Sequence, residues 1–240
     1  MRSETRPSEV EPGATLLQFF AKMLAELGPQ NWWPARTRLE IILGAILVQN
    51  TAWENAALAL RKFRQRGLLN LARLRIASRV ELESCVRPAG FFRQKTRTIQ
   101  NFLGWLQREC HSSLATMFQL ETEEGRRQLL EIKGLGPETV DAILLYAGRR
   151  PLFVADEYTR RILARHEMVL PGANYAEVQG FLHQHLPADP SLFNEYHALL
   201  VEVGKQYCKR QAPRCAACPL YGFLRQNQPK ELSFSMLRLG

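Results

Sequence analysis

Along most of this chain, apolar residues recur at the three- and four-residue spacing of an α-helix. Leucine and phenylalanine repeat in this way from Leu16 to Leu27, where Gly28 and Pro29 end the run. The sequence offers no convincing segment in which apolar and polar residues alternate, as they would in a half-buried strand. It therefore predicts an all-α fold. The expected helices cover residues 16–27, 39–48, 53–63, 68–74, 95–106, 125–132, 137–146, 157–165, 175–186 and 193–207.

Length and hydropathy narrow the class of protein. A chain of 240 residues can bury a core as one large domain or as two smaller ones. The longest apolar run, Ile41 to Val48, is too short to cross a membrane, and no segment resembles a secretory signal. We therefore expect a soluble, cytoplasmic protein. Residues 1–13, rich in Glu, Pro and Arg, are expected to form a mobile tail.

The net charge favours a phosphate-rich partner. Lysine and arginine number 32 against 23 aspartates and glutamates, so the net charge is +9, and most of the basic residues are arginine. The planar guanidinium group binds phosphate through paired hydrogen bonds, which makes nucleic acid the leading class of partner. An excess of this size also occurs in proteins that never touch DNA, so charge alone does not decide the matter.

A glycine-rich segment, Ile132-Lys133-Gly134-Leu135-Gly136-Pro137-Glu138-Thr139, lies between two of the expected helices. Its glycines permit positive φ and a close approach of the backbone to a ligand, and Pro137 suits the first turn of the next helix. Amide groups at that helix N-terminus would point outward and could bind a phosphate oxygen. Taken alone, the segment fits an ordinary helix–helix turn equally well. Asp156, eighteen residues after Glu138, makes a functional role the better interpretation.

Four features in order resemble the endonuclease III family of helix-hairpin-helix DNA glycosylases. They are a Gln-Asn-Thr turn at 49–51, the hairpin at 132–139, Asp156, and a cysteine cluster near the C-terminus. The likeness spans about residues 30–220, and segments 31–34, 48–51 and 86–91 look like the 3-methyladenine glycosylase branch. The resemblance implies a six-helix lobe over residues 30–150 and a second helical lobe from 14–29 plus 151–240, with an incomplete iron–sulfur-type cysteine loop. DNA would lie in the cleft between these lobes.

Asp156 is the candidate catalytic residue. Hydrolysis of an N-glycosidic bond drives the sugar toward an oxocarbenium ion, which a carboxylate stabilises while it orients or deprotonates water. Aspartate is also a favoured N-cap, and residues 157–165 are expected to be helical. The two roles are compatible, because a capping residue can still face the sugar.

Glu138 departs from the family's pattern. The resemblance implies that bifunctional members of the family have a lysine at this position, which attacks the sugar and leads to strand scission. A carboxylate cannot form an imine, so we expect the lysine-dependent AP lyase step to be absent. Lys133, in the same hairpin, is expected on the phosphate side. Glu138 also suits the first turn of a helix, where the dipole favours an acid.

A target base must leave the stack, and flipped bases are usually held between aromatic faces. Trp32, Trp33 and Trp53 are expected to form the base pocket, and the resemblance indicates Trp33 and Trp53 as a sandwich around the base. A cationic methylated purine stacks well on indole. One of the three is expected to serve only core packing.

The resemblance also indicates the DNA wedges. Gln49 would fill the gap left by the flipped nucleotide, and Phe91 or Phe92 could insert from the other side. The predicted DNA-binding residues are Gln49, Asn50, Phe91, Phe92, Lys133, Gly134, Leu135, Gly136 and Thr139.

Three of the five cysteines are clustered, at Cys208, Cys215 and Cys218, and follow the endonuclease III spacing. Leu224 stands where that pattern has its fourth cysteine. The odd total argues against a disulfide framework. Three interpretations stay open: a [4Fe–4S] cluster with one iron bound by something else, a zinc site completed by another residue, or a metal-free loop. The spacing favours the cluster, because thiolates suit iron–sulfur sites. The chemistry itself needs no cofactor. The isolated Cys85 and Cys110 are expected to be buried.

We predict a monofunctional DNA glycosylase that releases an alkylated base, 3-methyladenine in particular, from double-stranded DNA during base-excision repair. It would act as a nucleoid-associated monomer without membrane contact, and a downstream AP endonuclease would process the abasic product. Two alternatives remain: a glycosylase for an oxidised pyrimidine, a deaminated base or mispaired adenine, and a non-catalytic helix-hairpin-helix DNA-binding protein.

Overall fold

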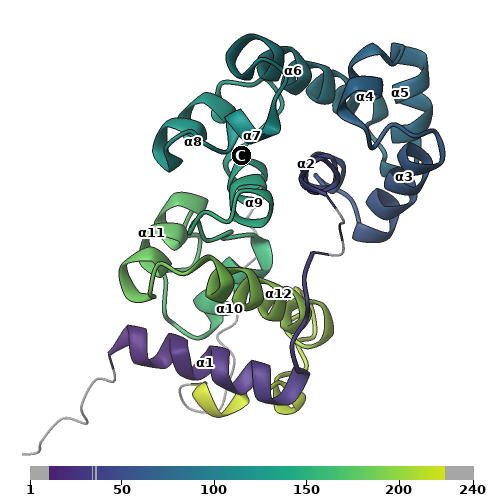
Figure 1. Cartoon of the computed structure of the whole chain (residues 1–240). Helices are drawn as coiled ribbons and strands as arrows, with labels where there is room; N and C mark the ends of the chain where they lie inside the picture. The colour runs from purple at the N-terminus through teal and green to yellow at the C-terminus, as the bar shows by residue number, and fades with distance from the viewer. Residues whose placement is uncertain (1–10, 34, 36, 225–240) are drawn as a thin grey trace, which may run out of the picture. The chain divides into compact units, whose positions relative to one another are not determined.

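The chain is described by a computed structural model that covers residues 11–33, 35 and 37–224. All regular elements in this part of the chain are helical, which confirms the expected all-α fold (Figure 1). None of the helices described is long and apolar enough to cross a bilayer. The α-helices are α1 (Pro12–Leu27), α2 (Arg38–Leu47), α3 (Trp53–Gln65), α4 (Leu71–Ile76), α5 (Arg79–Val86), α6 (Phe92–Cys110), α7 (Leu114–Met117), α8 (Thr122–Leu130), α9 (Pro137–Ala142), α10 (Glu157–Arg165), α11 (Tyr175–His185) and α12 (Pro190–Gln206). Shorter helical turns are η1 (Arg87–Ala89), the π-helical η2 (Ile143–Ala147), η3 (Cys215–Ala217) and η4 (Tyr221–Phe223).

Two helices, α5 and α7, were not expected from the apolar spacing. Helix α5 starts where the Ser78 hydroxyl accepts a hydrogen bond from the Glu81 amide, and Ser113 caps α7 in the same way. These caps stabilise helices too short to show a full apolar stripe. The expected helix over residues 137–146 is continuous in space, but its second half, η2, is a π-helix.

The chain divides into two compact units. We call Trp33–Val154 the hairpin unit, and Met1–Trp32 together with Ala155–Gly240 the terminal unit. Most of the expected mobile tail, residues 1–10, lies outside the described residues. Residues 12 and 13 of that tail belong to α1, because proline is well suited to the first turn of a helix.

Helix α2 is the central element of the hairpin unit, with α3, α6, α9 and η2 packed against it. The Thr37 hydroxyl caps its start by accepting from the Glu40 amide. Ile42, Leu43 and Ile46 are fully buried on it. An apolar helix buried on nearly all sides can hold the segments at its ends in fixed positions.

The terminal unit is built on α12, against which α1 and α10 pack (Figure 1). Phe19 and Phe193 are almost fully buried in its core. The Tyr196 hydroxyl donates a 2.7 Å hydrogen bond to the Leu16 carbonyl, so α1 is tied to α12 by a buried polar contact as well as by packing.

Candidate functional site

The hairpin between α8 and α9 has the backbone that its two glycines require. Gly134 adopts φ of 104°, and a Cβ atom there would lie 2.1 Å from Thr98 Oγ1, so a side chain is excluded on both counts. Gly136 faces open space. Its backbone is therefore accessible to a ligand.

The predicted DNA-binding residues of the hairpin differ in exposure. Lys133, Gly134 and Gly136 are exposed, whereas Leu135 and Thr139 are 7% and 8% exposed. The buried side chains anchor the hairpin to the unit, and the residues between them present their backbone to solvent.

Gln49, the predicted wedge, is bonded to this hairpin. Its Nε2 donates to the Gly134 carbonyl at 3.1 Å and to Thr139 Oγ1 at 2.8 Å. The next residue, Asn50, is exposed and adopts φ of 51°. The structure thus brings the turn after α2 and the hairpin together within one unit.

Phe91 and Phe92, the two candidates for insertion into DNA, differ in exposure. Phe91 is 65% exposed and has φ of 43°, directly after Gly90 with φ of 70°. Phe92 is half-buried, and the Arg87 guanidinium carbon lies 4.4 Å from its ring centroid. An exposed aromatic side chain on a left-handed residue suits insertion into DNA, so Phe91 is the better of the two.

Trp33 and Trp53, the predicted sandwich around the base, contact each other directly in this structure. Their rings meet edge to face, with centroids 5.0 Å apart and an angle of 79° between the planes. Aromatic pairs favour this geometry because a positive ring edge meets a negative ring face. Rings in such contact leave no gap for a base between them. Trp32 belongs to the terminal unit, where the Lys205 ammonium lies 5.6 Å from its ring centroid.

Tyr146 joins this aromatic cluster and was not singled out from the sequence. Its ring centroid lies 5.1 Å from that of Trp33. Tyr146 sits on the π-helical η2, and π-turns often occur at functional sites. The apolar run that contains it looks like ordinary helix, so the sequence carried no signal for the turn.

Glu138 lies in the first turn of α9 and is exposed. On the same helix, Asp141 accepts two hydrogen bonds, of 2.7 and 3.1 Å, from the guanidinium group of Arg126 on α8. Asp141 is fully buried. This paired contact fixes the two helices of the hairpin against each other.

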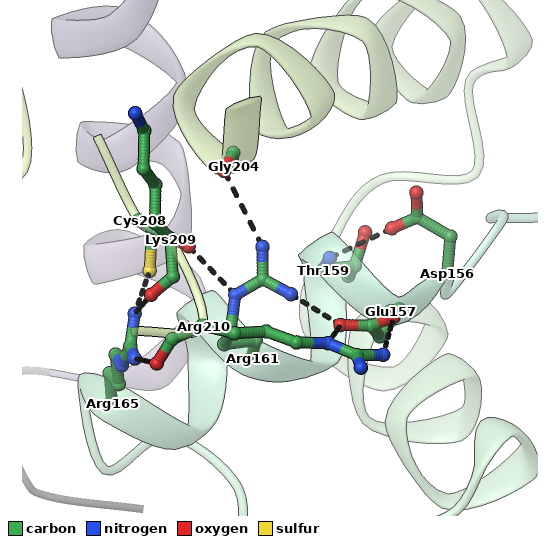
Figure 2. A network of polar contacts seen from close by, with 9 residues as sticks. All are labelled: Asp156, Glu157, Thr159, Arg161, Arg165, Gly204, Cys208, Lys209 and Arg210. Carbon is green, nitrogen blue, oxygen red and sulfur yellow. Dashed lines mark hydrogen bonds and ion pairs between the residues drawn. The ribbon is translucent and has the colours of Figure 1, made fainter. Parts of the chain in front are cut away.

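Asp156 caps α10, as its helix-capping role predicted (Figure 2). Its Oδ1 accepts from the Thr159 amide at 2.8 Å, and Oδ2 lies 3.5 Å from Nε2 of His197 on α12. The residue is 9% exposed. Burial raises the pKa of the carboxyl, but hydrogen bonding and charge at His197, helped by Thr159, outweigh it and hold the pKa below its ordinary value. Asp156 is therefore an ionised carboxylate at neutral pH.

His197 is the functional candidate that sequence reasoning missed. It lies on the largely apolar α12 and is 6% exposed. A polar residue on a buried helix face is a signal for a buried hydrogen bond. The identity of its partner depends on how α12 meets α10, which periodicity does not show.

Two arginines of α10 hold the segment that carries Cys208 (Figure 2). Arg161 Nε donates to the Cys208 carbonyl at 2.7 Å, and its Nη1 to Glu157 at 2.5 Å. Arg165 Nη1 donates to Cys208 Sγ at 3.1 Å and to the Lys209 carbonyl at 2.7 Å. The helix that Asp156 caps is thus bonded to the cysteine loop.

The three clustered cysteines line one pocket of the terminal unit. Leu224, at the place of the family's fourth cysteine, lines it too, as does His166. Among the residues that the structure describes, no group of three or more His, Cys, Asp or Glu side chains could hold a metal ion. The zinc site and the iron–sulfur cluster both stay predictions.

Comparison with known proteins relates this geometry to a family. The HhH-GPD superfamily base excision DNA repair protein family matches residues 43–187. A protein provisionally named a DNA repair glycosylase, from Methanocaldococcus jannaschii, is 36% identical over 210 residues, which cover 87% of this chain and 94% of the relative.

Solved structures agree. The crystal structure of H. pylori 3-methyladenine DNA glycosylase (MagIII) bound to 1,N6-ethenoadenine has a TM-score of 0.71 and 26% identity, and the match covers 82% of this chain and 98% of that one. A trapped endonuclease III–DNA covalent intermediate has a TM-score of 0.72 and 21% identity, over 89% of this chain and 94% of that one, a likeness of fold alone. The chain, with its glycine hairpin and its aspartate at the start of α10, therefore belongs to the HhH-GPD superfamily of base excision DNA repair proteins and is an endonuclease III-like DNA glycosylase.

Proposed function

We propose that the chain is a monofunctional DNA glycosylase that hydrolyses the N-glycosidic bond of an alkylated purine, of the 3-methyladenine class, in duplex DNA. The observation that carries the proposal is Asp156, a carboxylate kept ionised beside His197 at the N-terminus of α10. The relative from H. pylori is a 3-methyladenine DNA glycosylase, which supports the substrate class. The enzyme acts as a monomer, and its abasic product goes to a downstream AP endonuclease.

The chemistry follows from the charge of Asp156. As the glycosidic bond breaks, positive charge develops on the sugar, and a nearby carboxylate stabilises it and orients or deprotonates the attacking water. An alkylated purine carries positive charge before cleavage and leaves as a neutral base, so no protonating acid is needed. An electron-poor base also stacks favourably on the aromatic cluster of Trp33, Trp53 and Tyr146.

Asp156→Asn tests the catalytic role without disturbing the cap. Asparagine caps helices about as well as aspartate, so α10 should stay intact. Loss of the carboxylate charge should lower the rate of base release at least about 100-fold. Affinity for an abasic duplex should change less than about twofold, since the phosphate contacts expected at the hairpin remain. Full activity of Asp156→Asn would contradict the role assigned to this residue.

A panel of duplexes with single damaged bases tests the substrate class, with free base as the readout. Release of 3-methyladenine should exceed release of oxidised pyrimidines, deaminated bases and mispaired adenine. Release of one of the latter alone would replace the proposal with the corresponding glycosylase, and binding without any release would indicate a non-catalytic DNA-binding protein.

Glu138 supports the monofunctional part of the proposal. Its carboxylate at the start of α9 cannot form an imine with the sugar. Incubation with abasic DNA and borohydride should therefore trap no covalent complex, with a bifunctional endonuclease III as the positive control. A trapped adduct on this chain would overturn the monofunctional assignment.

We propose, as a separate point, that Cys208, Cys215 and Cys218 hold a [4Fe–4S] cluster in which one iron lacks a cysteine ligand. The shared pocket and the buried Arg165 guanidinium, which suits a thiolate, support this. Leu224 offers no ligand atom, so the open iron needs another donor. Anaerobically purified protein should be brown and contain iron and sulfide. A colourless, metal-free and fully active preparation would refute the cluster.

A further inference from the structure

A buried lysine of the hairpin unit, Lys95, contacts two backbone carbonyls. Lys95, in the first turn of α6, is 2% exposed. Its ammonium donates to the Leu47 carbonyl at 2.8 Å and to the Ala89 carbonyl at 2.7 Å. Burial lowers the pKa of Lys95 to about 8, so the side chain is still mostly a cation at neutral pH. A buried cation is unfavourable unless its hydrogen bonds are kept, so the two carbonyls must stay where they are.

Both carbonyls close a helix. Leu47 is the last residue of α2, and Ala89 is the last residue of η1. Carbonyl groups at a helix C-terminus lack a partner within the helix and carry partial negative charge, which an ammonium satisfies. Lys95 therefore holds the ends of two helices against one point of α6.

Each of these helix ends leads directly into a turn that we expect to enter DNA. Gln49 and Asn50 follow α2, and Gly90 and Phe91 follow η1. Asn50 and Phe91 have positive φ. A left-handed non-glycine residue is strained and persists only where its surroundings hold it. The Lys95 contacts lie three residues before Asn50 and two residues before Phe91.

The same face of α6 also holds the hairpin. Thr98, one turn after Lys95, packs so closely on Gly134 that a Cβ atom there would clash with it. Asn101, a further turn along, donates from Nδ2 to the Lys133 carbonyl at 2.8 Å. Helix α6 thus contacts the two helix ends and the hairpin through Lys95, Thr98 and Asn101.

We propose that Lys95 is a positioning residue that holds the Gln49 turn and the Phe91 turn at a fixed separation, so that both enter the duplex at the same nucleotide. The inference rests on the proposed function, because the turns act as wedges only in a protein that extrudes a nucleotide. Lys95 is buried, and it acts through two backbone carbonyls.

Lys95→Met removes the ammonium and keeps an unbranched side chain of similar length. A duplex with 2-aminopurine beside the damaged nucleotide brightens when its bases unstack. With enzyme in excess, the rate of this brightening and the single-turnover rate of base release should both fall at least about tenfold, because a misplaced group loses most of its effect. The Kd for an undamaged duplex should stay within about twofold, since the hairpin contacts remain.

Leu106→Ala is the matched control. Leu106 is fully buried on the same helix, about three turns farther along, so its truncation lowers stability without touching the ammonium. If Lys95→Met loses no more activity than Leu106→Ala at an equal folded fraction, measured by thermal unfolding, the residue is merely structural and the proposal is overturned. Should Lys95→Met fail to fold, Lys95→Gln, which keeps a donor without the charge, takes its place with the same expected losses.

An abasic duplex separates this proposal from the proposed function. Placing 2-aminopurine opposite the abasic site reports entry of the turns without any base release. The wild-type protein should brighten this duplex and Lys95→Met should not, whatever base the enzyme removes. Equal brightening by both proteins would overturn the role of Lys95 alone. Absence of base release by the wild-type protein, with the brightening difference intact, would overturn only the proposed glycosylase substrate.

Discussion

The pKa of Asp156 depends mainly on burial and on His197, whose Nε2 lies 3.5 Å from the carboxylate. Burial raises the pKa of Asp156, and the histidine is the main cause that lowers it. His197→Gln removes the imidazole that lowers this pKa, so burial should dominate and the pKa of Asp156 should rise. Because only the ionised carboxylate stabilises the sugar cation, base release should be lost at a higher pH on acidification than in the wild type.

The pH profile of single-turnover base release measures this shift. His183→Gln, an exposed position on α11, removes a histidine elsewhere in the terminal unit and should leave the acidic limb in place. If the acidic limb of the pH profile lies at the same pH in His197→Gln as in the wild type, the histidine does not set the charge of Asp156.

The role of a single residue could be predicted where it depends only on the local backbone. Asp156 could be recognised as an N-cap because its preference for that place is local, and the structure has it there. Gly134 could be recognised because a tight hairpin needs positive φ. The ring orientation of Trp33 and Trp53 and the partner of His197 could not, because they depend on packing between segments far apart in the chain.

The two helices of the hairpin depend on the ion pair between Arg126 and Asp141. Arg126→Leu leaves a fully buried carboxylate without its main cation and should lower the free energy of unfolding by about 3 kcal/mol. Replacing both residues with leucine removes the charges together and should cost much less. Urea unfolding of the wild type, both single variants and the double variant measures the coupling. Additive losses would contradict a brace between α8 and α9.

Elements followed from the sequence where an apolar stripe ran for several turns. Helix α10 has the predicted bounds, and α2, α3 and α11 differ from theirs by only one or two residues at an end. Helices α5 and α7 were missed because they depend on serine caps rather than on a stripe. Ser78 followed by Glu81 is a capping signature that could have revealed α5. The π-turn of η2 had no such signature.

At the scale of the whole molecule, the net charge of +9 and the exposed hairpin make different predictions about DNA binding. If local phosphate contacts determine the affinity for DNA, the log of the affinity falls with the log of the salt concentration at a slope of about −0.9 per contact. Lys133 is exposed on the hairpin, so Lys133→Ala should reduce the magnitude of this slope by about one.

Lys22→Ala is the matched control, because it lowers the net charge by the same amount. Lys22 lies on α1 in an exposed ion pair with Glu26, at 2.7 Å. If contacts at the hairpin carry the binding, Lys22→Ala keeps the wild-type slope. Equal changes in the two variants would mean that DNA responds to the overall charge, and the phosphate contact assigned to the hairpin would have to be withdrawn. Titrations of one undamaged duplex across a salt series, with each variant at the same folded fraction, decide between the two.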